Sequence, residues 1–536
     1  MVGGNIMYQD DIEKFHGNYE VYRQLYAGEH EKVFKRAEHL VNSGELSARL
    51  QYGNIAKQMS TPYVIVNVSK MIVDIPTLFI ARSLGDLKTN YPINEEELND
   101  DYEADTEHLE GNQNEEVFDL QQETLDQIAE NSKLYQQHTM NLKQWQIDGG
   151  LVLVPEVVNG KVKITFKERN IYYELDDGVT YQLRYFKELD GEEYLHIHQE
   201  TEHENGLEVE HMVYTLNAKG EETEVEDDEI IEAVTNIKAE DRHVFYEGRK
   251  NKFFEYLPYN PTFMNKYGNS AIAGLEDKQD EVNWTMTRTA QIFERNGKPR
   301  ISVTKEIMDR LVQISEENFG VPYKHDHRNL EVTEINDQGQ SLQIHQIDVS
   351  KIGDITYVKD IIKMMLMETQ TSEKAIDFFT NGGSGSAQSG IAKFYDLFLS
   401  IMKSEQLRDE YVTFLQRGVE NCLWLLQQNN ADIEVEKPIV MQKEMLPVTT
   451  KETAEQNNAS FLAGTQSLEQ TIRNNNPDKS EEWIMSELEK IEEGKTSQDS
   501  ISLFRGNMTA ENFNDNRPLN EPIRPRTEDI EESEEE

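Results

Sequence analysis

The sequence predicts an α+β protein that is mainly helical, and three observations support this fold class. Apolar residues recur at helical spacing in three long stretches without proline between residues 269 and 427. Between residues 151 and 268, apolar and polar residues alternate instead, as in half-buried strands. Glycine, proline and asparagine mark the breaks between these segments. At 536 residues, the chain is long enough for several domains.

The composition narrows the classes of protein to which the chain can belong. Hydrophobic residues make up 37% of the chain and charged residues 29%, so it is less apolar than an average globular protein. We expect an elongated chain that completes its burial in an oligomer, although a disordered tail would also lower the hydrophobic fraction. The formal net charge of −48 argues against tight DNA binding, because non-specific affinity comes from Lys and Arg that displace counterions. Part of this charge is explained by solubility and by disordered acidic segments.

The sequence also argues against several kinds of site. The single cysteine, Cys422, rules out an intramolecular disulfide and a cysteine zinc site within one chain, and we expect it to be buried. G-x-S-x-G, H-E-x-x-H and Walker signatures are absent, so we expect no catalysis and no cofactor. We find neither a leader segment nor an apolar stretch of about 18 residues, which predicts an intracellular protein that does not span a membrane.

Residues 1–150 are predicted to be mainly helical. A helix should begin after Asn67, with a break or kink near Pro76. Residues 89–132 contain fifteen acidic residues and no Lys or Arg. We expect the stretch 89–116 to be a solvated insertion, because it lacks the spacing of a calcium-binding loop. Helical spacing resumes after this insertion.

Residues 151–268 are predicted to form an antiparallel meander. Apolar and polar residues alternate in segments such as VKITF and LEVEHMVYTL, with turn dipeptides between the segments. Asn-Gly and Asp-Gly supply the positive φ angles that tight hairpins need. The turn dipeptides are Asn159-Gly160, Asp177-Gly178, Asp190-Gly191, Asn205-Gly206 and Lys219-Gly220.

Residues 269–296 are predicted to form one long helix. Its apolar residues form a narrow seam that favours helix-on-helix packing, and we expect neighbouring copies of the chain to bury it. The helix would be roughly 42 Å long at 1.5 Å per residue. A glycine and a proline follow it and would end it. The seam consists of Leu275, Val282, Met286 and Phe293.

Residues 297–347 are predicted to form a small α/β segment with a strand (PRISV), a helix (TKEIMDRLVQI) and a second extended piece (LQIHQIDV). Basic residues gather here: Arg300, Lys305, Arg310, Lys324 and Arg328. They could form salt bridges with acidic neighbours on the same helices, dock a partner, or face passing DNA. The sequence leaves these alternatives open.

Two further rods, residues 348–380 and 391–443, are predicted to be helical, and the second has a dense apolar face. Residues 381–390 separate them with small and polar side chains. This tract does not end in Gly-Lys-Ser/Thr and does not follow a strand, so it is not a phosphate-binding loop. It fits either a linker or a mobile loop. Its residues are Asn381, Gly382, Gly383, Ser384, Gly385, Ser386, Ala387, Gln388, Ser389 and Gly390.

The C-terminal part is predicted to contain shorter helices at residues 444–507. One of them carries an apolar stripe of Trp483, Ile484, Leu488 and Ile491. Residues 508–536 are rich in Asn, Pro and Glu, a composition that predicts a disordered acidic tail.

The order of these segments resembles the portal proteins of tailed bacteriophages, especially of long-tailed phages that infect Gram-positive bacteria. Residues 22–36 (YRQLYAGEHEKVFKR) are similar to the family's Y-x-G-x-H element. Residues 66–83 (VNVSKMIVDIPTLFIARS) are similar to its asparagine–lysine–aspartate helix. The resemblance covers roughly residues 22–427. It implies a wing formed by 1–150, 151–268 and 391–443, stem helices at 269–296 and 348–380, a clip at 297–347, a DNA-facing tunnel loop at 381–390 and a crown at 444–507.

The resemblance also implies a function. About a dozen copies would form a ring at one capsid vertex, the channel through which double-stranded DNA is packaged and ejected without tight binding. The clip would dock the large terminase subunit and the head–tail adaptor, and the ring would contact the major capsid and scaffolding proteins. The protein would belong to the virion, and to the host cytoplasm during assembly. It would need no catalysis of its own, because the terminase hydrolyses ATP.

Two other functions fit parts of the sequence. A non-portal phage structural or scaffold protein would oligomerise through the same rods into open or smaller assemblies. An enzyme could use His196 and His198, which share one face of a strand and could contact one metal ion, as could His325 and His327. Neither pair has a third ligand at a fixed spacing, so surface histidines are the favoured explanation.

Overall fold

The computed structural model describes residues 15–44, 63–90, 108–158, 160–216, 222–296, 300–319, 331–335, 343–345, 355–375, 390–428, 430–446, 450–476, 479 and 483–491. The chain divides into two compact units, residues 1–446 and 447–536. Helices outweigh strands, and the sheets are largely antiparallel. The predicted class, α+β and mainly α, is confirmed.

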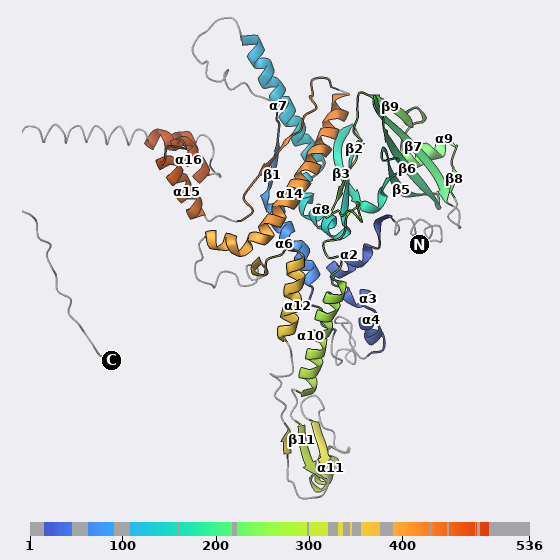
Figure 1. Ribbon diagram of the computed structural model, residues 1–536, viewed down its shortest axis with the longest axis vertical. Helices are drawn as coiled ribbons and strands as arrows, with labels where there is room; N and C mark the ends of the chain where they lie inside the picture. The colour runs from blue at the N-terminus through green and yellow to red at the C-terminus, as the bar shows by residue number, and fades with distance from the viewer. Residues whose placement is uncertain are drawn as a thin grey trace, which may run out of the picture. The chain divides into compact units, whose positions relative to one another are not determined.

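A six-stranded antiparallel sheet occupies the middle of the first unit's sequence (Figure 1). Its strands follow the order β4-β5-β6-β7-β8, and β9 pairs with β7. Asp190 and Gly191, between β5 and β6, have φ angles of 52° and 84°, as a tight hairpin requires. The predicted antiparallel strands are present, but residues 151–268 form strands of two sheets and not one meander. Asn159 and the Lys219-Gly220 turn lie outside the described residues. The strands are β4 (Tyr172–Glu174), β5 (Thr180–Leu189), β6 (Glu192–Glu202), β7 (Gly206–Leu216), β8 (Glu222–Glu224) and β9 (His243–Glu247).

A second, three-stranded sheet has the order β10-β2-β3 and is also antiparallel. Three helices, α7, α8 and α14, pack against it. A further pair of strands, β1 and β14, joins segments that are far apart in the sequence, and sequence reasoning missed it. The elements are β1 (Leu84–Lys88), α7 (His108–Asn131), α8 (Leu134–Asp148), β2 (Gly150–Val158), β3 (Lys161–Glu168), β10 (Glu255–Pro258), α14 (Gly390–Gln427) and β14 (Ile439–Gln442). Short helices η2 (Arg169–Ile171), α9 (Asp228–Thr235) and η3 (Ala239–Asp241) lie between strands.

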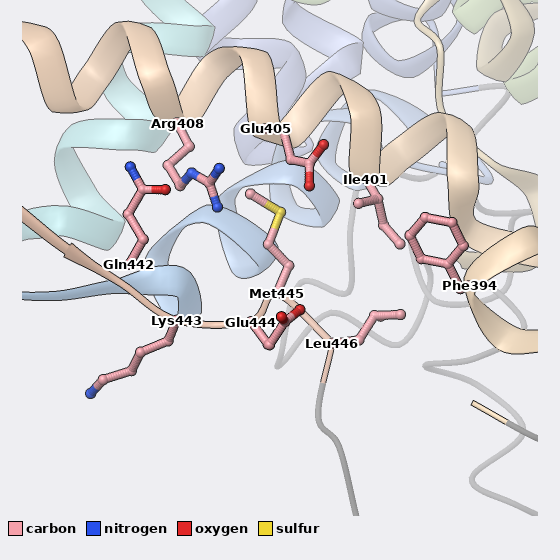
Figure 2. A pocket seen from close by; sticks show the side chains of 9 residues that line it. All are labelled: Phe394, Ile401, Glu405, Arg408, Gln442, Lys443, Glu444, Met445 and Leu446. Carbon is pink, nitrogen blue, oxygen red and sulfur yellow. The ribbon is translucent and has the colours of Figure 1, made fainter. Parts of the chain in front are cut away.

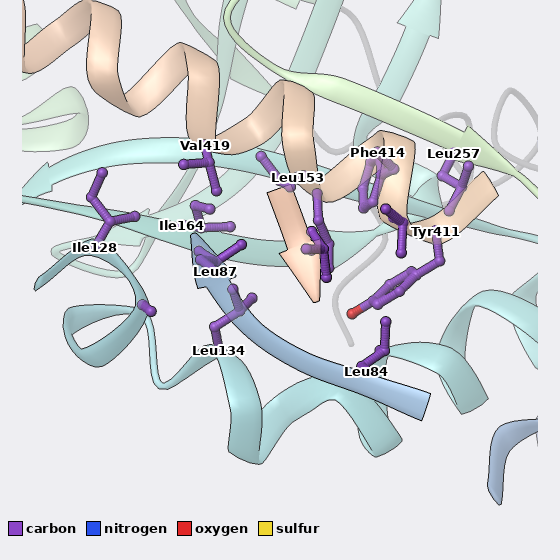
Figure 3. Close-up of a cluster of buried hydrophobic side chains, with 14 of the residues drawn as sticks. Leu84, Leu87, Ile128, Leu134, Leu153, Ile164, Leu257, Tyr411, Phe414 and Val419 are labelled. Carbon is purple, nitrogen blue, oxygen red and sulfur yellow. The ribbon is translucent and has the colours of Figure 1, made fainter. Parts of the chain in front are cut away.

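The largest core cluster of the first unit lies between this sheet and α14 (Figure 3). Tyr411 and Phe414 of α14 point toward Leu153 of β2. Tyr411 is fully buried and stacks on Trp145, with ring centroids 6.3 Å apart. Cys422 is buried in the same cluster, as predicted. Each such large side chain stabilises the fold by about 1.5–3 kcal/mol through the area that it removes from water.

The N-terminal part is helical, as predicted, but two details differ. The helix α6 begins after Asn67, whose side chain accepts a hydrogen bond from the backbone of Lys70. It continues through Pro76, so the expected break is wrong. The acidic stretch 89–116 was expected to be a solvated insertion, yet α7 already begins at His108. The helices are α2 (Glu20–Ala27), α3 (His30–Val33), α4 (Lys35–Asn42) and α6 (Val68–Ser83).

The region between residues 276 and 368 consists of two helices with a small α/β segment between them in the chain. The order of its sheet is β12-β11-β13, in which β11 pairs parallel with β12 and antiparallel with β13. Sequence reasoning missed β12. The elements are α10 (Glu276–Asn296), β11 (Arg300–Thr304), α11 (Lys305–Phe319), β12 (Glu331–Ile335), β13 (Gln343–His345) and α12 (Ile355–Glu368).

The second unit contains α15 (Thr450–Leu462) and α16 (Leu468–Asn475), which pack together, and residues 483–491 are also helical. A hydrogen bond of 2.6 Å from Asn457 to Asn475 joins α15 to α16. Ile484 of the predicted stripe is buried. The predicted tail, 508–536, lies outside the described residues.

Candidate functional site

Two helices that are distant in the sequence, α10 and α12, lie side by side (Figure 1). Val282 on α10 and Met365 on α12 are both fully buried in one cluster. Lys278, near the start of α10, forms an ion pair with Glu368 at the end of α12, with Nζ 2.9 Å from Oε2. The two helices therefore run antiparallel, and the chain passes from one to the other through the β11 sheet.

The start of the first helix differs from the prediction. The helix begins at Glu276 and not at Asn269, because the residues before it form turns. The backbone N–H of Ala271 donates to the carbonyl of Gln146 at 2.8 Å, which ties these turns to α8. Gly274 has a φ angle of 80°, a left-handed conformation that cannot continue a right-handed helix. Contacts with α8 thus replace the first turns of the predicted helix.

The apolar seam is mostly buried by contacts within one chain. Leu275 and Val282 are only 3% and 0% exposed, and Met286 packs against the same cluster. Phe293, in contrast, is 42% exposed. The expectation that neighbouring copies bury the whole seam is therefore wrong, because Leu275, Val282 and Met286 already pack against α12 and the N-terminal helices. Only Phe293 remains available to another molecule.

A ladder of polar side chains runs along another side of α10. Gln279, Asn283 and Thr287 follow one another at a spacing of four residues, and all three are fully buried. Their oxygens accept hydrogen bonds from the backbone N–H groups of Ser69, Val66 and Val64, at 3.2, 3.0 and 2.9 Å. The ladder fixes the extended segment that leads into α6. Sequence reasoning missed it, although uncharged polar residues at this spacing were the available signal.

The two N-terminal stretches that carry the family resemblance meet beside this ladder. Asn67 Nδ2 donates to the carbonyl of Tyr26 at 3.0 Å, and the Tyr26 hydroxyl donates to Asp74 Oδ1 at 2.7 Å. Asp74 also pairs with Lys143, with Nζ 2.9 Å from Oδ1. His30 lies 2.7 Å from Asn283, measured from Nδ1 to Nδ2. Polar contacts thus join four segments that are far apart in the sequence.

The second helix ends earlier than predicted. α12 stops at Glu368, because Gln370 adopts a left-handed φ of 53° and the backbone N–H of Thr371 returns to the carbonyl of Leu366. The ammonium group of Lys403, on α14, donates a hydrogen bond of 2.8 Å to the carbonyl of Thr369. Burial lowers the pKa of Lys403 to about 8. The end of α12 is therefore attached to α14.

Helix α14 buries one part of its apolar face and exposes another. Residues toward its C-terminal end, such as Tyr411 and Leu423, are buried in the core. Its N-terminal part and the neighbouring helix α12 expose large apolar side chains. These are Phe394, Tyr395, Phe398, Leu399 and Met402 on α14, and Tyr357, Met364 and Met367 on α12; we call them the exposed apolar set. Large exposed apolar groups of this kind are typical of association surfaces.

A pocket of about 320 Å³ lies between α14 and residues 442–446 (Figure 2). Ile401 and Phe394 line it from the helix, and Met445 lines it from the strand side. Arg408 and Glu405 add one charge of each sign. Lys443 and Glu444 add a further charge of each sign, so the lining mixes charged and apolar side chains.

The predicted docking residues do not form a basic face on α11. Lys305 and Arg310 are exposed there, but Glu306, Asp309, Glu316 and Glu317 are exposed on the same helix. Arg300 lies in β11. Lys324 and Arg328 lie outside the described residues, as do His325 and His327. In the predicted tunnel loop, residues 381–389 also lie outside them, and Gly390 is the first residue of α14.

The histidine pair of the β-rich part has a partner that the sequence did not reveal. His211 of β7 stands directly opposite His198 of β6 in the sheet register. Its Nδ1 lies 3.2 Å from His196 Nε2 and 3.3 Å from His198 Nδ1. His198 Nε2 lies 2.7 Å from Oε1 of Glu200, a fully buried carboxylate. The expectation of surface histidines is wrong for this pair, since His196 is only 5% exposed.

Burial determines the charge state of two of these rings. Desolvation lowers the pKa of His196 to about 3 and that of His211 to about 2. Both rings are therefore neutral at physiological pH and keep a lone pair on one nitrogen. Sequence reasoning could not find His211, because its place depends on the pairing of β6 with β7.

Comparisons with known proteins give no family. No protein-family model matches the chain, and no curated protein matches it. In the part of the chain that the structure describes, no helix combines the length and apolar character needed to cross a membrane.

Proposed function

We propose that the chain is the portal protein of a tailed bacteriophage. A ring of about a dozen copies would form the channel for DNA packaging and ejection at one capsid vertex. The observation that carries this proposal is the order of elements from α10 through the β11 sheet to α12 and then to the 38-residue helix α14. In portal proteins, by resemblance, a stem helix, a clip, a second stem helix and a wing helix follow in that order.

The antiparallel pair of α10 and α12 supports the proposal. A stem must hold two helices rigidly side by side while the segment between them reaches a partner. The ion pair of Lys278 with Glu368 and the buried contacts of Val282 fix this pair within one chain. The polar ladder on α10 anchors the pair to the N-terminal helices. The stem would therefore be rigid before any ring forms.

The exposed apolar set supports assembly. Tyr395 is 73% exposed and Met367 is 74% exposed, which is costly for an isolated chain in water. In a ring these side chains would be covered by a neighbouring copy, giving an apolar interface of the obligate kind. Phe293 would extend this interface along α10.

The charge of α12 suits a surface that DNA passes. Lys359 and Lys363 are exposed on this helix, and so are Asp360 and Glu368. The described surface of the helix is thus close to neutral, and it offers no row of cations that would hold phosphates. In the proposed channel, DNA would slide along this helix, and the tract 381–390 would face it.

The proposal also assigns binding partners to the clip and to the assembled ring. The segment between β11 and β13 would dock the large terminase subunit and then the head–tail adaptor, and the ring would contact the major capsid and scaffolding proteins. Because α11 exposes both signs of charge, this docking would use mixed ion pairs and not a basic face.

The mass of the purified chain in solution tests the proposal against a scaffold protein. A portal should give one closed assembly of defined mass over a range of concentrations, because a ring has no open end to extend. A scaffold should give smaller or open assemblies whose mass rises with concentration. A chain that stays monomeric at high concentration would contradict the proposal.

A further inference from the structure

A tight turn between β10 and α10 presents two apolar side chains to solvent. Phe263 is 100% exposed and Met264 is 84% exposed, the highest values among the large apolar side chains of the described residues. Thr262 and Asn265, on either side of them, exchange backbone hydrogen bonds of 3.0 and 3.1 Å. We call Phe263 and Met264 the apolar tip. Within one chain, the tip adds almost nothing to stability, because it removes so little apolar area from water.

Hydrogen bonds fix the base of this turn. Asn265 Nδ2 donates to the carbonyl of Gly268 at 3.0 Å and to Asn269 Oδ1 at 2.9 Å. The guanidinium of Arg169, which is only 1% exposed, donates to the carbonyls of Tyr267 and Gly268 at 3.1 and 3.3 Å. The backbone that carries the tip is therefore ordered before any partner binds, so binding costs less conformational entropy. Exposed Phe and Met on an ordered base are typical of an interface.

A ring imposes a condition on the surfaces that meet in it. Around a single rotation axis with more than two copies, every contact between neighbours joins two different surfaces of the chain, because a surface that meets its own equivalent closes a dimer. The exposed apolar set on α12 and α14 therefore cannot be covered by the same set of the next copy. Another surface must cover it, and the apolar tip is the most exposed apolar candidate in the part of the chain that the structure describes.

The chemistry of the two surfaces is complementary. The exposed apolar set consists mainly of aromatic and Met side chains, and the tip adds one of each; methionine sulfur packs favourably against aromatic rings. Lys266 is the only charged residue of the stretch 260–268, and Asp396 is the only charged residue of the stretch 394–402. Asp396 is exposed, and the Lys266 side chain, although paired with Glu174 at 3.0 Å, is still 63% exposed. The two surfaces thus carry opposite charges beside their apolar groups.

We propose that the apolar tip of one copy packs on the exposed apolar set of the next copy around the ring, with Lys266 facing Asp396. This inference rests on the proposed function, because it names the two surfaces that the ring brings together. Each copy would insert its tip against one neighbour and receive the tip of the other, which is a heterologous contact.

Cysteine cross-linking of the full-length chain tests this pairing. Cys422 is buried, so engineered surface cysteines are the ones that react. In the double variant Met264→Cys, Phe398→Cys, a short bifunctional maleimide should link copy to copy and give a ladder of multimers on a denaturing gel. Either substitution alone should give no ladder. Met140→Cys, Phe398→Cys is the matched control, because Met140 is 60% exposed on α8, and it should give no ladder either.

An exchange of charges gives a second readout. Lys266→Glu and Asp396→Lys should each weaken assembly by about 2–5-fold, as expected for one exposed ion pair. The combined variant should assemble as the wild type does, because opposite charges face each other again. A combined variant that assembles no better than the single variants would contradict the facing of Lys266 and Asp396.

Two results of the cross-linking would overturn the proposal. One is a double variant that assembles, as its mass in solution shows, but gives no ladder, which would place the tip against another surface. The other is a cross-linked dimer in Phe398→Cys alone, which would show that the exposed apolar set meets its own equivalent. A chain that stays monomeric contradicts the proposed function and this inference together, whereas assembly without a ladder contradicts the inference alone.

Discussion

Asn283 Nδ2 lies 2.7 Å from Nδ1 of His30, and this hydrogen bond joins the helix α10 to the N-terminal helices. Asn283 also accepts the backbone N–H of Val66 and a hydrogen bond from Gln279. A single buried side chain therefore connects α10, the segment before α6 and the start of α3. The rigidity of the proposed stem depends on this connection.

Replacing Asn283 should destabilise the chain. In Asn283→Ala, the N–H of Val66 loses its buried partner and the contact with His30 is lost, and a buried polar group left unpaired costs about 1–3 kcal/mol. We expect the free energy of unfolding to fall by about 2–4 kcal/mol in urea titrations. Arg288→Ala, on the exposed side of the same helix, should change it by less than about 0.5 kcal/mol. Equal effects of the two substitutions would show that the ladder is not a stabilising contact.

The exposed apolar set should control assembly without controlling the fold. The double variant Tyr395→Ser, Met402→Ser removes two side chains that are 73% and 50% exposed in the single chain, so circular dichroism should show the secondary structure of the wild type. We expect the assembled species to be lost or reduced at least tenfold in mass measurements. Val179→Ser, at an exposed apolar residue just before β5, serves as the matched control and should assemble normally. An assembly unaffected by the double variant would place the subunit contact elsewhere.

The helices α14 and α10 show how far the sequence could predict this fold. Most of α14 was predictable because an uninterrupted apolar pattern fills it from residue 391 to residue 427, but the predicted helix over 391–443 is too long, since α14 ends at Gln427 and β14 follows. The start of α10 was not, since residues 269–275 have an acceptable helical sequence, and contact with Gln146 decides otherwise. Propensity is a weak guide wherever a tertiary contact competes with it.

The candidate sites could not be predicted either, because they too depend on tertiary contacts. The seam of Leu275 and Val282 was recognised as a packing surface, but an apolar pattern does not tell a partner within the chain from one in a neighbouring copy. His211 and the pair β1 and β14 depend on strand pairing between separate segments. Only the register of the folded sheet brings such residues together.

Acid should destabilise the core through His138. Burial lowers the pKa of His138 from 6.5 to about 4, and Nδ1 of the ring lies 3.2 Å from the Tyr411 hydroxyl. The folded chain thus binds this proton less readily than the unfolded chain, so the stabilisation is complete above pH 6.5 and is lost as the pH falls from 6.5 toward 4. We expect His138→Gln to reduce the pH slope of the unfolding free energy by up to about 1.4 kcal/mol per pH unit in that window.

Urea titrations of both chains at pH 7.5, 5.5 and 4.5 measure this difference. Because the variant lacks only one titrating group, the other buried residues contribute equally to both curves. Parallel curves for the wild type and His138→Gln would contradict the assignment of a neutral, buried ring.

Changes in the tract 381–390 should impair DNA packaging without preventing ring assembly. Deletion of residues 381–389 from a phage genome that encodes the chain should leave rings intact while the number of DNA-filled capsids falls, because the tract is proposed to face the channel. Lys at several tract positions should slow packaging by attracting phosphates. Loss of rings in the deletion would identify the tract as a structural linker, and unchanged packaging in the Lys variants would contradict low-friction passage.

End-on electron-microscopy images of the purified full-length chain test the central claim most directly. The account predicts closed rings with an open central channel, formed because the apolar side chains of α12 and α14 pack against the next copy. Monomers, or open and irregular assemblies without a channel, would contradict it.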